Sequence, residues 1–279
     1  MTDGRGPRAE LEITSPANAR IKHLVALRRR RPRNDAGVTL VEGYAELDLA
    51  LSAGVAPREL YYSPELAHDD RLGVLGRVME RGAEVVRVSQ AVFGKIAYRE
   101  SPDGWLAVVP TVDAELDRLE LGEQPLLLIC EGVEKPGNLG AILRTADAAG
   151  VTAVIATDPV TDWGNPNLVR ASKGAVFSVP VAAAPTARVL PWLAGHGVTV
   201  AAATPDGDVL LGDADLTGPV AIAVGSETHG LSGPWLGQAD VTVRIPMFGR
   251  ADSLNVAASA AIVVYEAVRQ RMVRQRTPG

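Results

Sequence analysis

Five short apolar runs in the second half of the chain constrain its fold more than any other feature. They are rich in Val, Ile, Leu and Ala and lie at residues 126–129, 153–156, 198–203, 220–224 and 241–245. Continuous apolar runs, without alternating polar residues, are typical of strands that are buried on both faces and therefore of a parallel sheet. Helical segments separate the runs, including residues 138–149 and a final segment from 255 to about 274. The pattern predicts an α/β domain at 125–279.

The first half of the chain predicts a smaller α/β domain at 1–110. A basic helix over 18–31, stopped by Pro32, is followed by strands and helices in alternation. The strands are expected at 38–43, 59–62, 84–88 and 105–109, with helices at 44–53 and 71–81. The acidic stretch 111–124, which precedes Pro125, is interpreted as a linker between the two domains.

The composition is that of a soluble globular protein, with 47% hydrophobic and 22% charged residues. No run of about eighteen uncharged apolar residues is present, so no transmembrane helix is expected. The polar first ten residues do not resemble a secretory signal. Cys130 is the single cysteine and ends an apolar run, which predicts a buried thiol in a protein of the reducing cytoplasm.

Basic residues are concentrated near the N-terminus, although the net charge is −5. Residues 1–33 carry nine basic and three acidic side chains, among them Arg28, Arg29, Arg30 and Arg31. Arginine presents a planar fork of donors that suits phosphate, so the cluster is a candidate RNA contact. The alternative is a solvated helix end whose charges complement the negative end of the helix dipole. The residues alone leave both interpretations open.

The loops after the apolar runs are candidate binding loops. In open α/β sheets, ligands bind beyond the carboxyl ends of the strands. Gly225 directly follows the run 220–224 and Pro246 follows the run 241–245. The segment after 126–129 is Glu131-Gly132-Val133-Glu134-Lys135-Pro136-Gly137-Asn138, which lacks both the dinucleotide fingerprint and a Walker-type phosphate loop. A ligand is therefore expected at this edge, bound in another way.

Three separated segments carry the most specific motifs of the chain. They are Asn138-Leu139-Gly140-Ala141-Ile142-Leu143-Arg144-Thr145, Gly225-Ser226-Glu227-Thr228-His229-Gly230, and Ile245-Pro246-Met247 with Ser253-Leu254-Asn255-Val256. Together with Asn165-Pro166-Asn167-Leu168-Val169-Arg170-Ala171-Ser172-Lys173-Gly174-Ala175, their order resembles the signature of the SpoU (TrmH-like) family of RNA ribose 2′-O-methyltransferases, in the SPOUT superfamily. The resemblance spans most of residues 125–270. Thr228 stands where many relatives carry glycine.

The resemblance implies a fold, a cofactor and an assembly. In this family the last third of the chain passes through a loop and forms a deep trefoil knot. The α/β-knot domain binds S-adenosylmethionine, and two copies form a homodimer whose interface buries the final helix beside the cofactor. The small apolar residues around that helix, including Ala257, Ala258 and Ala261, are typical of close packing. Burial within its own domain is the alternative for this helix.

The resemblance also implies roles for residues. Asn138 and Arg144 match the asparagine and arginine associated with catalysis, and Glu227, Ser253 and Asn255 lie in the same loops and are assigned to catalysis with them. Gly225, Ile245, Met247 and Leu254 are assigned to S-adenosylmethionine, since Gly225 lets backbone approach a ligand and the others supply apolar walls. Core packing is the alternative for those three walls. Arg170 matches a second arginine linked to RNA or phosphate.

Two residues need a chemical argument. The family proposal makes Arg144 a general base, but the high pKa of a guanidinium makes its neutral form expensive at neutral pH. We therefore expect Arg144 to stabilise the developing alkoxide and the adjacent phosphate. His229 lies in the glycine loop without a second histidine or a metal-ligand spacing nearby, so it is interpreted as a bystander and no metal is expected.

The predicted function is transfer of a methyl group to a ribose 2′-hydroxyl of ribosomal RNA, most of all 23S rRNA or the large subunit. The N-terminal domain resembles ribosomal and kink-turn-binding domains of some family members, on Asn18-Ala19-Arg20-Ile21-Lys22 and Val41-Glu42-Gly43. The Ala, Gly and Arg richness suggests a GC-rich bacterial genome, where self-resistance enzymes of the avilamycin or thiostrepton type belong to this family. A tRNA 2′-O-methyltransferase and an inactive RNA-binding ribosome-assembly protein are the alternatives. The protein is expected in the cytoplasm and without a membrane partner.

Overall fold

The computed structural model describes residues 11–67, 70–250 and 252–276, and the chain divides into two compact units. Unit 1 comprises Met1–Val112 and Gly164–Arg170, and unit 2 comprises Asp113–Trp163 and Ala171–Gly279. The segment 164–170 therefore packs with unit 1, although both its neighbours along the chain belong to unit 2. The hydroxyl of Thr39 donates to the carbonyl of Gly164, which ties this segment to the sheet of unit 1.

Unit 1 is built on a mixed five-stranded sheet with the order β1-β4-β3-β5-β2. The strands are β1 (Leu11–Ile13), β2 (Val38–Glu42), β3 (Glu59–Tyr62), β4 (Glu84–Val88) and β5 (Trp105–Pro110). Strand β4 is parallel to β1 and β3, whereas β5 runs antiparallel to β2 and β3. The four predicted strands are confirmed. Strand β1 was not predicted, because three residues are too few to show a pattern.

Five short helices complete the N-terminal part of unit 1, namely α1 (Ala19–Ala26), α2 (Arg30–Ala36), α3 (Tyr44–Ser52), α4 (Val74–Glu80) and α5 (Gln90–Ile96). Ile21, Leu24 and Phe93 pack against the sheet in one buried cluster. The prediction of a single helix over 18–31 stopped by Pro32 was wrong, because the first helix ends at Ala26 and Pro32 lies inside α2. Pro32 is the third residue of α2, in the first turn, where a backbone N–H needs no helical acceptor.

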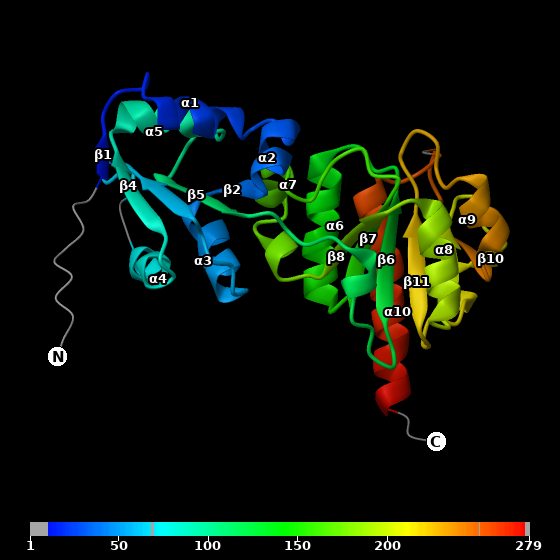
Figure 1. Ribbon diagram of the computed structural model, residues 1–279. Coiled ribbons are helices and arrows are strands. Elements are labelled where there is room, and N and C mark those ends of the chain that lie inside the picture. Colours follow the sequence, from blue (N-terminus) through cyan, green and yellow to red (C-terminus); the bar gives the residue numbers. More distant parts are fainter. Residues whose placement is uncertain (1–10, 68–69, 251, 277–279) are drawn as a thin grey trace. The chain divides into compact units, whose positions relative to one another are not determined.

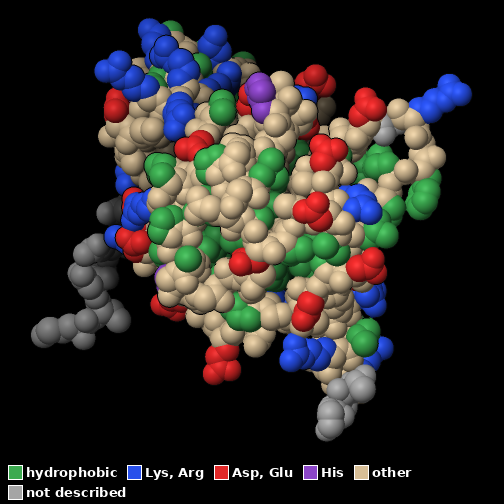
Figure 2. Space-filling view, turned by 90° about the vertical axis from the view of Figure 1, so that its right-hand side faces the viewer, with side chains coloured by type: hydrophobic (Ala, Val, Ile, Leu, Met, Phe, Trp, Pro, Cys, Tyr) green, Lys and Arg blue, Asp and Glu red, His purple; other side chains and the backbone are tan. Residues whose placement is uncertain are grey.

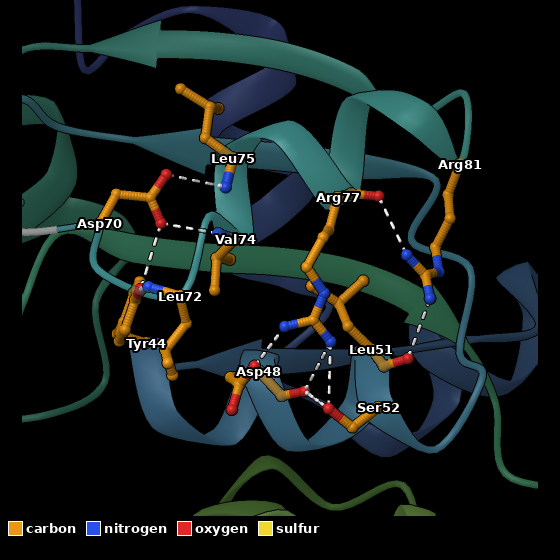
Figure 3. Close-up of polar contacts among 10 residues, drawn as sticks. All are labelled: Tyr44, Asp48, Leu51, Ser52, Asp70, Leu72, Val74, Leu75, Arg77 and Arg81. Atoms are coloured by element: carbon orange, nitrogen blue, oxygen red, sulfur yellow. Dashed lines mark hydrogen bonds and ion pairs between the residues drawn. The ribbon is translucent and has the colours of Figure 1, made fainter.

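A polar network fixes α4 to α3 and explains why α4 begins at Val74, three residues after the predicted start (Figure 3). The carboxylate of Asp70 accepts hydrogen bonds from the backbone N–H of Val74 at 2.6 Å and of Leu75 at 3.2 Å, as an N-terminal cap does. The Tyr44 hydroxyl donates to the same carboxylate at 3.1 Å. Further along α4, Arg77 pairs with Asp48 of α3.

Unit 2 is built on a seven-stranded sheet with the order β10-β12-β9-β11-β6-β7-β8, in which every pairing is parallel. The strands are β6 (Leu126–Glu131), β7 (Ala153–Thr157), β8 (Val181–Ala184), β9 (Thr199–Ala203), β10 (Val209–Leu210), β11 (Val220–Val224) and β12 (Val241–Arg244). The predicted parallel sheet and its five strands are confirmed. Strands β8 and β10 were not predicted, because they have four and two residues.

Helices cover both faces of this sheet (Figure 1). They are α6 (Pro136–Ala149), α8 (Thr186–Gly195), α9 (Gly233–Gln238) and α10 (Val256–Arg276), with 3-10 turns η1 (Leu116–Arg118), η2 (Ala175–Phe177) and η3 (Leu211–Asp213). The remaining helix, α7 (Pro166–Ala171), packs with unit 1 over its first five residues. Leu127 and Ile129 of β6 pack under α8, α9 and η1 in one buried cluster that includes Trp235. Alternate strand residues, such as Leu128, point to the other face, where α6 packs against α10.

Cys130 is buried, as predicted, and burial raises the pKa of its thiol to about 12. Leu116, within the stretch interpreted as a linker, is fully buried in the core of unit 2. None of the described helices combines the length and apolarity needed to cross a lipid bilayer. The trefoil knot that the resemblance implies stays a prediction.

Candidate active site

Three polar side chains from distant parts of the sequence meet in unit 2. Asn138 lies in the first turn of α6, Glu227 lies in the loop after β11, and Asn255 directly precedes α10. Nδ2 of Asn138 donates to Oε1 of Glu227. Nδ2 of Asn255 donates to Oδ1 of Asn138 at 3.3 Å and lies 3.5 Å from Oε1 of Glu227. We call these three residues the amide–carboxylate cluster.

The starts of two helices hold the cluster in place. Oδ1 of Asn255 accepts from the N–H of Ala257 at 3.0 Å, and its carbonyl accepts from Ser259 at 2.9 Å, so Asn255 caps α10. Pro136 opens α6, where its fixed φ suits the first turn. Helix N-termini carry a partial positive charge, which stabilises the carboxylate of Glu227 beside them. The described residues supply no donor to its second oxygen, Oε2, which is therefore available to a ligand.

The loop that carries Glu227 is closed on itself. Ser226 and Gly230 form an isolated antiparallel bridge, with the N–H of Gly230 donating to the carbonyl of Ser226 at 2.9 Å. A Cβ on Gly225 would overlap the backbone of Gly230 and Leu231. Glycine at 225 is thus required by the return of the loop itself. From the sequence, only the approach of a ligand was predicted as the reason for this glycine.

Glu131 was not singled out from the sequence, although it anchors the same loop. It is the last residue of β6 and is buried. Its carboxylate accepts from both the N–H and the hydroxyl of Ser232, each at 2.6 Å. An acidic residue directly after an apolar run was the signal available in the sequence. Glu131 thereby fixes where the loop from 225 to 230 ends.

Arg144 lies on α6 with Asn138 but outside the cluster. Six residues separate them, which corresponds to about 9 Å of helix rise and a third of a turn around the axis. The Arg144 side chain is exposed and forms no hydrogen bond or ion pair with any described residue. Its guanidinium is therefore available to an anionic ligand. Its assignment to catalysis stays a prediction.

The residues assigned to the cofactor lie on two loops of unit 2. Gly225 starts the loop after β11, and Ile245 directly follows β12. Ile245 and Leu254 are half-buried, whereas Met247 is 38% exposed. Ser253, assigned to catalysis, is exposed on the same loop. Because Asn255 ends that loop, the apolar side chains share one segment with the amide–carboxylate cluster.

The arginines assigned to RNA lie in unit 1. Arg28 donates to the carbonyls of Lys95 and Ala97 at 2.7 and 2.6 Å, so it closes the end of α5. Arg29 and Arg30 are exposed, and the exposed Arg31 lies 4.0 Å from Asp35. Arg170, at the end of the segment 164–170, is exposed and pairs with no described residue. Figure 2 shows acidic side chains scattered over the face that is turned to the viewer.

Among the residues described, no three His, Cys, Asp or Glu side chains come together as potential ligands. His229 is exposed, and its contact in the loop is the backbone N–H, which donates to Ser226 Oγ at 3.2 Å.

The chain matches two families of known proteins. Residues 125–265 match the SpoU rRNA Methylase family, and residues 18–107 match the MRM3-like substrate binding domain. Among curated proteins, a 23S rRNA (uridine(2479)-2′-O)-methyltransferase from Streptomyces viridochromogenes is 34% identical over 98% of this chain and 97% of its own length. The 23S rRNA (guanosine(2553)-2′-O)-methyltransferase RlmP of Bacillus subtilis is 28% identical over 91% of this chain and 98% of its own.

A solved structure supports the same relationship. The AdoMet-bound rRNA methyltransferase from Sinorhizobium meliloti superposes with a TM-score of 0.85 and is 31% identical, covering 96% of this chain and 98% of its own. The similarity extends over both units and includes all three motif segments in unit 2. The chain therefore belongs to the SpoU rRNA Methylase family.

Proposed function

We propose that this protein transfers a methyl group from S-adenosylmethionine to a ribose 2′-hydroxyl of 23S ribosomal RNA in the cytoplasm. The family and the activities of its full-length relatives support this function. The observation that carries it is the convergence of Asn138, Glu227 and Asn255, from three separated motifs, beside loops at one edge of the parallel sheet. Ligands of open α/β sheets bind at that edge.

S-adenosylmethionine fits the side chains and backbone available there. When bound, it would supply the methyl group from its positively charged sulfur. The bond between sulfur and methyl would break as the ribose oxygen bonds to the methyl and loses its proton, leaving S-adenosylhomocysteine. Ile245, Met247 and Leu254 provide apolar surface for an adenine, and the loops around Gly225 provide backbone donors and acceptors. The carboxylate of Glu227 complements a positive charge. The free Oε2 of Glu227 can also accept a hydrogen bond from a hydroxyl group.

Arg144 is proposed to act on the nucleophile. Its unpaired guanidinium can donate to a developing alkoxide and to the neighbouring phosphate at once, because its donors form a planar fork. Proton removal then falls to a phosphate oxygen or water, since arginine keeps its proton at neutral pH. Ser253 adds a hydroxyl on the loop that ends at Asn255.

RNA recognition is proposed for residues 1–110, the N-terminal domain, which falls within unit 1. Its match to a substrate-binding family supports this assignment. Arg29, Arg30 and Arg31 are exposed, whereas Arg28 is half-buried against the end of α5, so the first three present more of their side chains to a phosphate. Arg170 is proposed to add a further contact. The catalytic domain is proposed at 125–279 with 111–124 as the connection.

A homodimer is proposed through the outer face of α10. Ala260, Val263, Val264 and Ala267 of this helix are buried in unit 2. Ala258, Ile262 and Tyr265 are exposed and recur at the spacing of one helix face. This second apolar stripe favours a partner helix. A light-scattering mass of one chain at micromolar concentration would remove the homodimer.

The first test is methyl transfer itself. Radiolabelled S-adenosylmethionine is incubated with total tRNA, deproteinised 23S rRNA and intact large subunits, followed by nucleoside analysis. We expect label on a ribose of 23S rRNA and a loss of about 10²–10³ in kcat for Arg144→Ala. Arg118→Ala, at an exposed arginine paired with Asp113, is the control. Near-full activity of Arg144→Lys would show that the planar fork is dispensable.

The alternatives give different results in the same assay. Label on tRNA alone would make the protein a tRNA 2′-O-methyltransferase. Cofactor binding without label on any RNA would indicate an RNA-binding assembly protein. A finer proposal is resistance to a ribosome-targeting antibiotic, which follows from the resemblance to self-resistance enzymes of this family. Expression in a sensitive host that raises the inhibitory concentration, lost with Arg144→Ala, would support resistance, and an unchanged concentration would leave a housekeeping role.

A further inference from the structure

One aromatic side chain, on the loop between β12 and α10, is almost fully exposed. Phe248 is 96% exposed, whereas the next most exposed large hydrophobic among the described residues, Met79, is 59% exposed. A phenylalanine ring is normally buried in a protein core, because its transfer out of water is favourable. Because the Phe248 ring is almost fully exposed, it contributes almost no burial free energy to the stability of unit 2. A ring in that position is free to receive a ligand.

The ring lies on the same loop as Asn255, a member of the amide–carboxylate cluster. The segment between β12 and α10 begins at Ile245 and ends at Asn255, which contacts Asn138 and Glu227. Phe248 precedes Asn255 by seven residues, which limits their separation to about 25 Å even in a fully extended chain. Phe248 also directly follows Met247, an assigned cofactor residue. An extended ligand such as a nucleic acid strand can therefore span both the cluster and the ring.

A free positive charge accompanies the ring. Arg250 is exposed and forms no ion pair or hydrogen bond with a described residue, including the nearby Asp252. A Cβ added to Gly249, between Phe248 and Arg250, would meet no atom within 4 Å. Single-stranded RNA offers two complementary groups, a flat base that stacks on an aromatic ring and a phosphate that pairs with a guanidinium. A nonpolar protein partner would leave Arg250 unpaired, so the charge favours RNA.

We propose that Phe248 stacks on an unpaired base of the substrate RNA and that Arg250 binds an adjacent phosphate. The pair positions the nucleotide next to the reacting ribose and contributes to the choice of target. This inference rests on the proposed methyltransferase function and assigns it a positioning residue. Phe248 takes no part in the chemical step, so its removal raises KM for RNA while kcat at saturating RNA changes little.

The test compares Phe248→Ala, Phe248→Trp and Arg250→Gln with the wild type. We measure kcat and KM with the RNA that the wild type methylates, and the affinity for 23S rRNA by filter binding. Stacking on one base predicts a loss of about 5- to 150-fold in RNA affinity for Phe248→Ala, with retention in Phe248→Trp. The affinity for S-adenosylmethionine and the melting temperature should stay unchanged. Leu236→Ala, at another exposed apolar residue of unit 2, is the control.

The possible outcomes separate the inference from the proposed function. If the wild type methylates RNA and Phe248→Ala has the same KM and RNA affinity as the wild type, the inference is overturned and the proposed function stands. A change in light-scattering mass in Phe248→Ala would also overturn it, because the ring would then belong to an interface between two copies. RNA binding without methylation would overturn the function, while the affinities of the variants would still test the stacking. Failure to bind and to methylate any RNA would overturn both.

Discussion

Nδ2 of Asn255 donates to Oδ1 of Asn138 across 3.3 Å, although 117 residues separate them in the sequence. Each asparagine stands at the start of a helix, and each amide also faces the same oxygen of Glu227. The starts of α6 and α10 are therefore locked to the loop after β11. This arrangement makes the carboxylate a fixed element rather than a freely rotating side chain. Its consequences can be measured.

Glu227→Gln is expected to lower kcat at least about tenfold, because a neutral amide weakens charge-assisted hydrogen bonds and can place an N–H where Oε2 is available to accept from a ligand. The melting temperature should change little, since Glu227 is exposed. His229→Ala in the same loop is the matched control and should keep activity within twofold. A Glu227→Gln enzyme as active as the wild type would show that the carboxylate is dispensable for catalysis.

Gly225→Ala is expected to open the loop from 225 to 230. The added methyl would overlap the carbonyl of Gly230, and overpacking of this kind costs about 1–3 kcal/mol. Calorimetry should show weaker binding of S-adenosylmethionine together with a lower melting temperature. Gly237→Ala, on α9 with open space around it, is the control and should leave both values unchanged. If Gly225→Ala binds S-adenosylmethionine as tightly as the wild type, the loop from 225 to 230 is not part of the cofactor site.

Arg271 is expected to stabilise unit 2 more than any neighbouring arginine of α10. Its guanidinium donates to the carbonyls of Gly218 at 2.6 Å, Gln124 and Pro125 each at 3.0 Å, and lies 3.4 Å from that of Leu216. Hydrogen bonds to charged groups contribute about 1.5–3 kcal/mol, so Arg271→Ala should lower the free energy of unfolding by about that much. Urea denaturation measures it. Arg274→Ala, which loses one contact to Thr217, should cost less than half as much.

Glu42 is expected to make unit 1 less stable as the pH rises. Burial raises the pKa of its carboxyl above the ordinary 4.5, with Asp103 adding to the shift and the Tyr98 N–H and Arg99 opposing it. The folded state therefore holds the proton more tightly than the unfolded chain. Stability from this group is complete below about pH 4.5 and is lost as the pH rises through the folded pKa.

Glu42→Gln removes this dependence, because the amide oxygen can still accept from the N–H of Tyr98. The variant should gain stability relative to the wild type between pH 4 and pH 8, measured as urea midpoints. Glu80→Gln, at an exposed residue of α4, is the control and should follow the wild type. A constant difference between Glu42→Gln and the wild type over this range would contradict the prediction.

The sequence by itself determined the parallel sheet, because the runs at 220–224 and 241–245 are too continuously apolar for a sheet with a solvated face. The family motifs also identified Asn138, Glu227 and Asn255 in advance. Local sequence patterns did not predict very short elements such as β10. They also did not predict α2, because Pro32 in its first turn was taken as the end of a helix.

Only the tertiary structure decided which side chains meet and which are already engaged. Arg28 looked equivalent to Arg29 in the sequence, yet it caps α5 through carbonyls nearly seventy residues away. Gly225 is needed by the backbone of Gly230, and Glu131 is fixed by Ser232, 101 residues on. Hydrogen bonds and close contacts form through space, and their partners are set by how strands and helices pack. Periodicity along the chain records which faces are buried but carries no information about those partners.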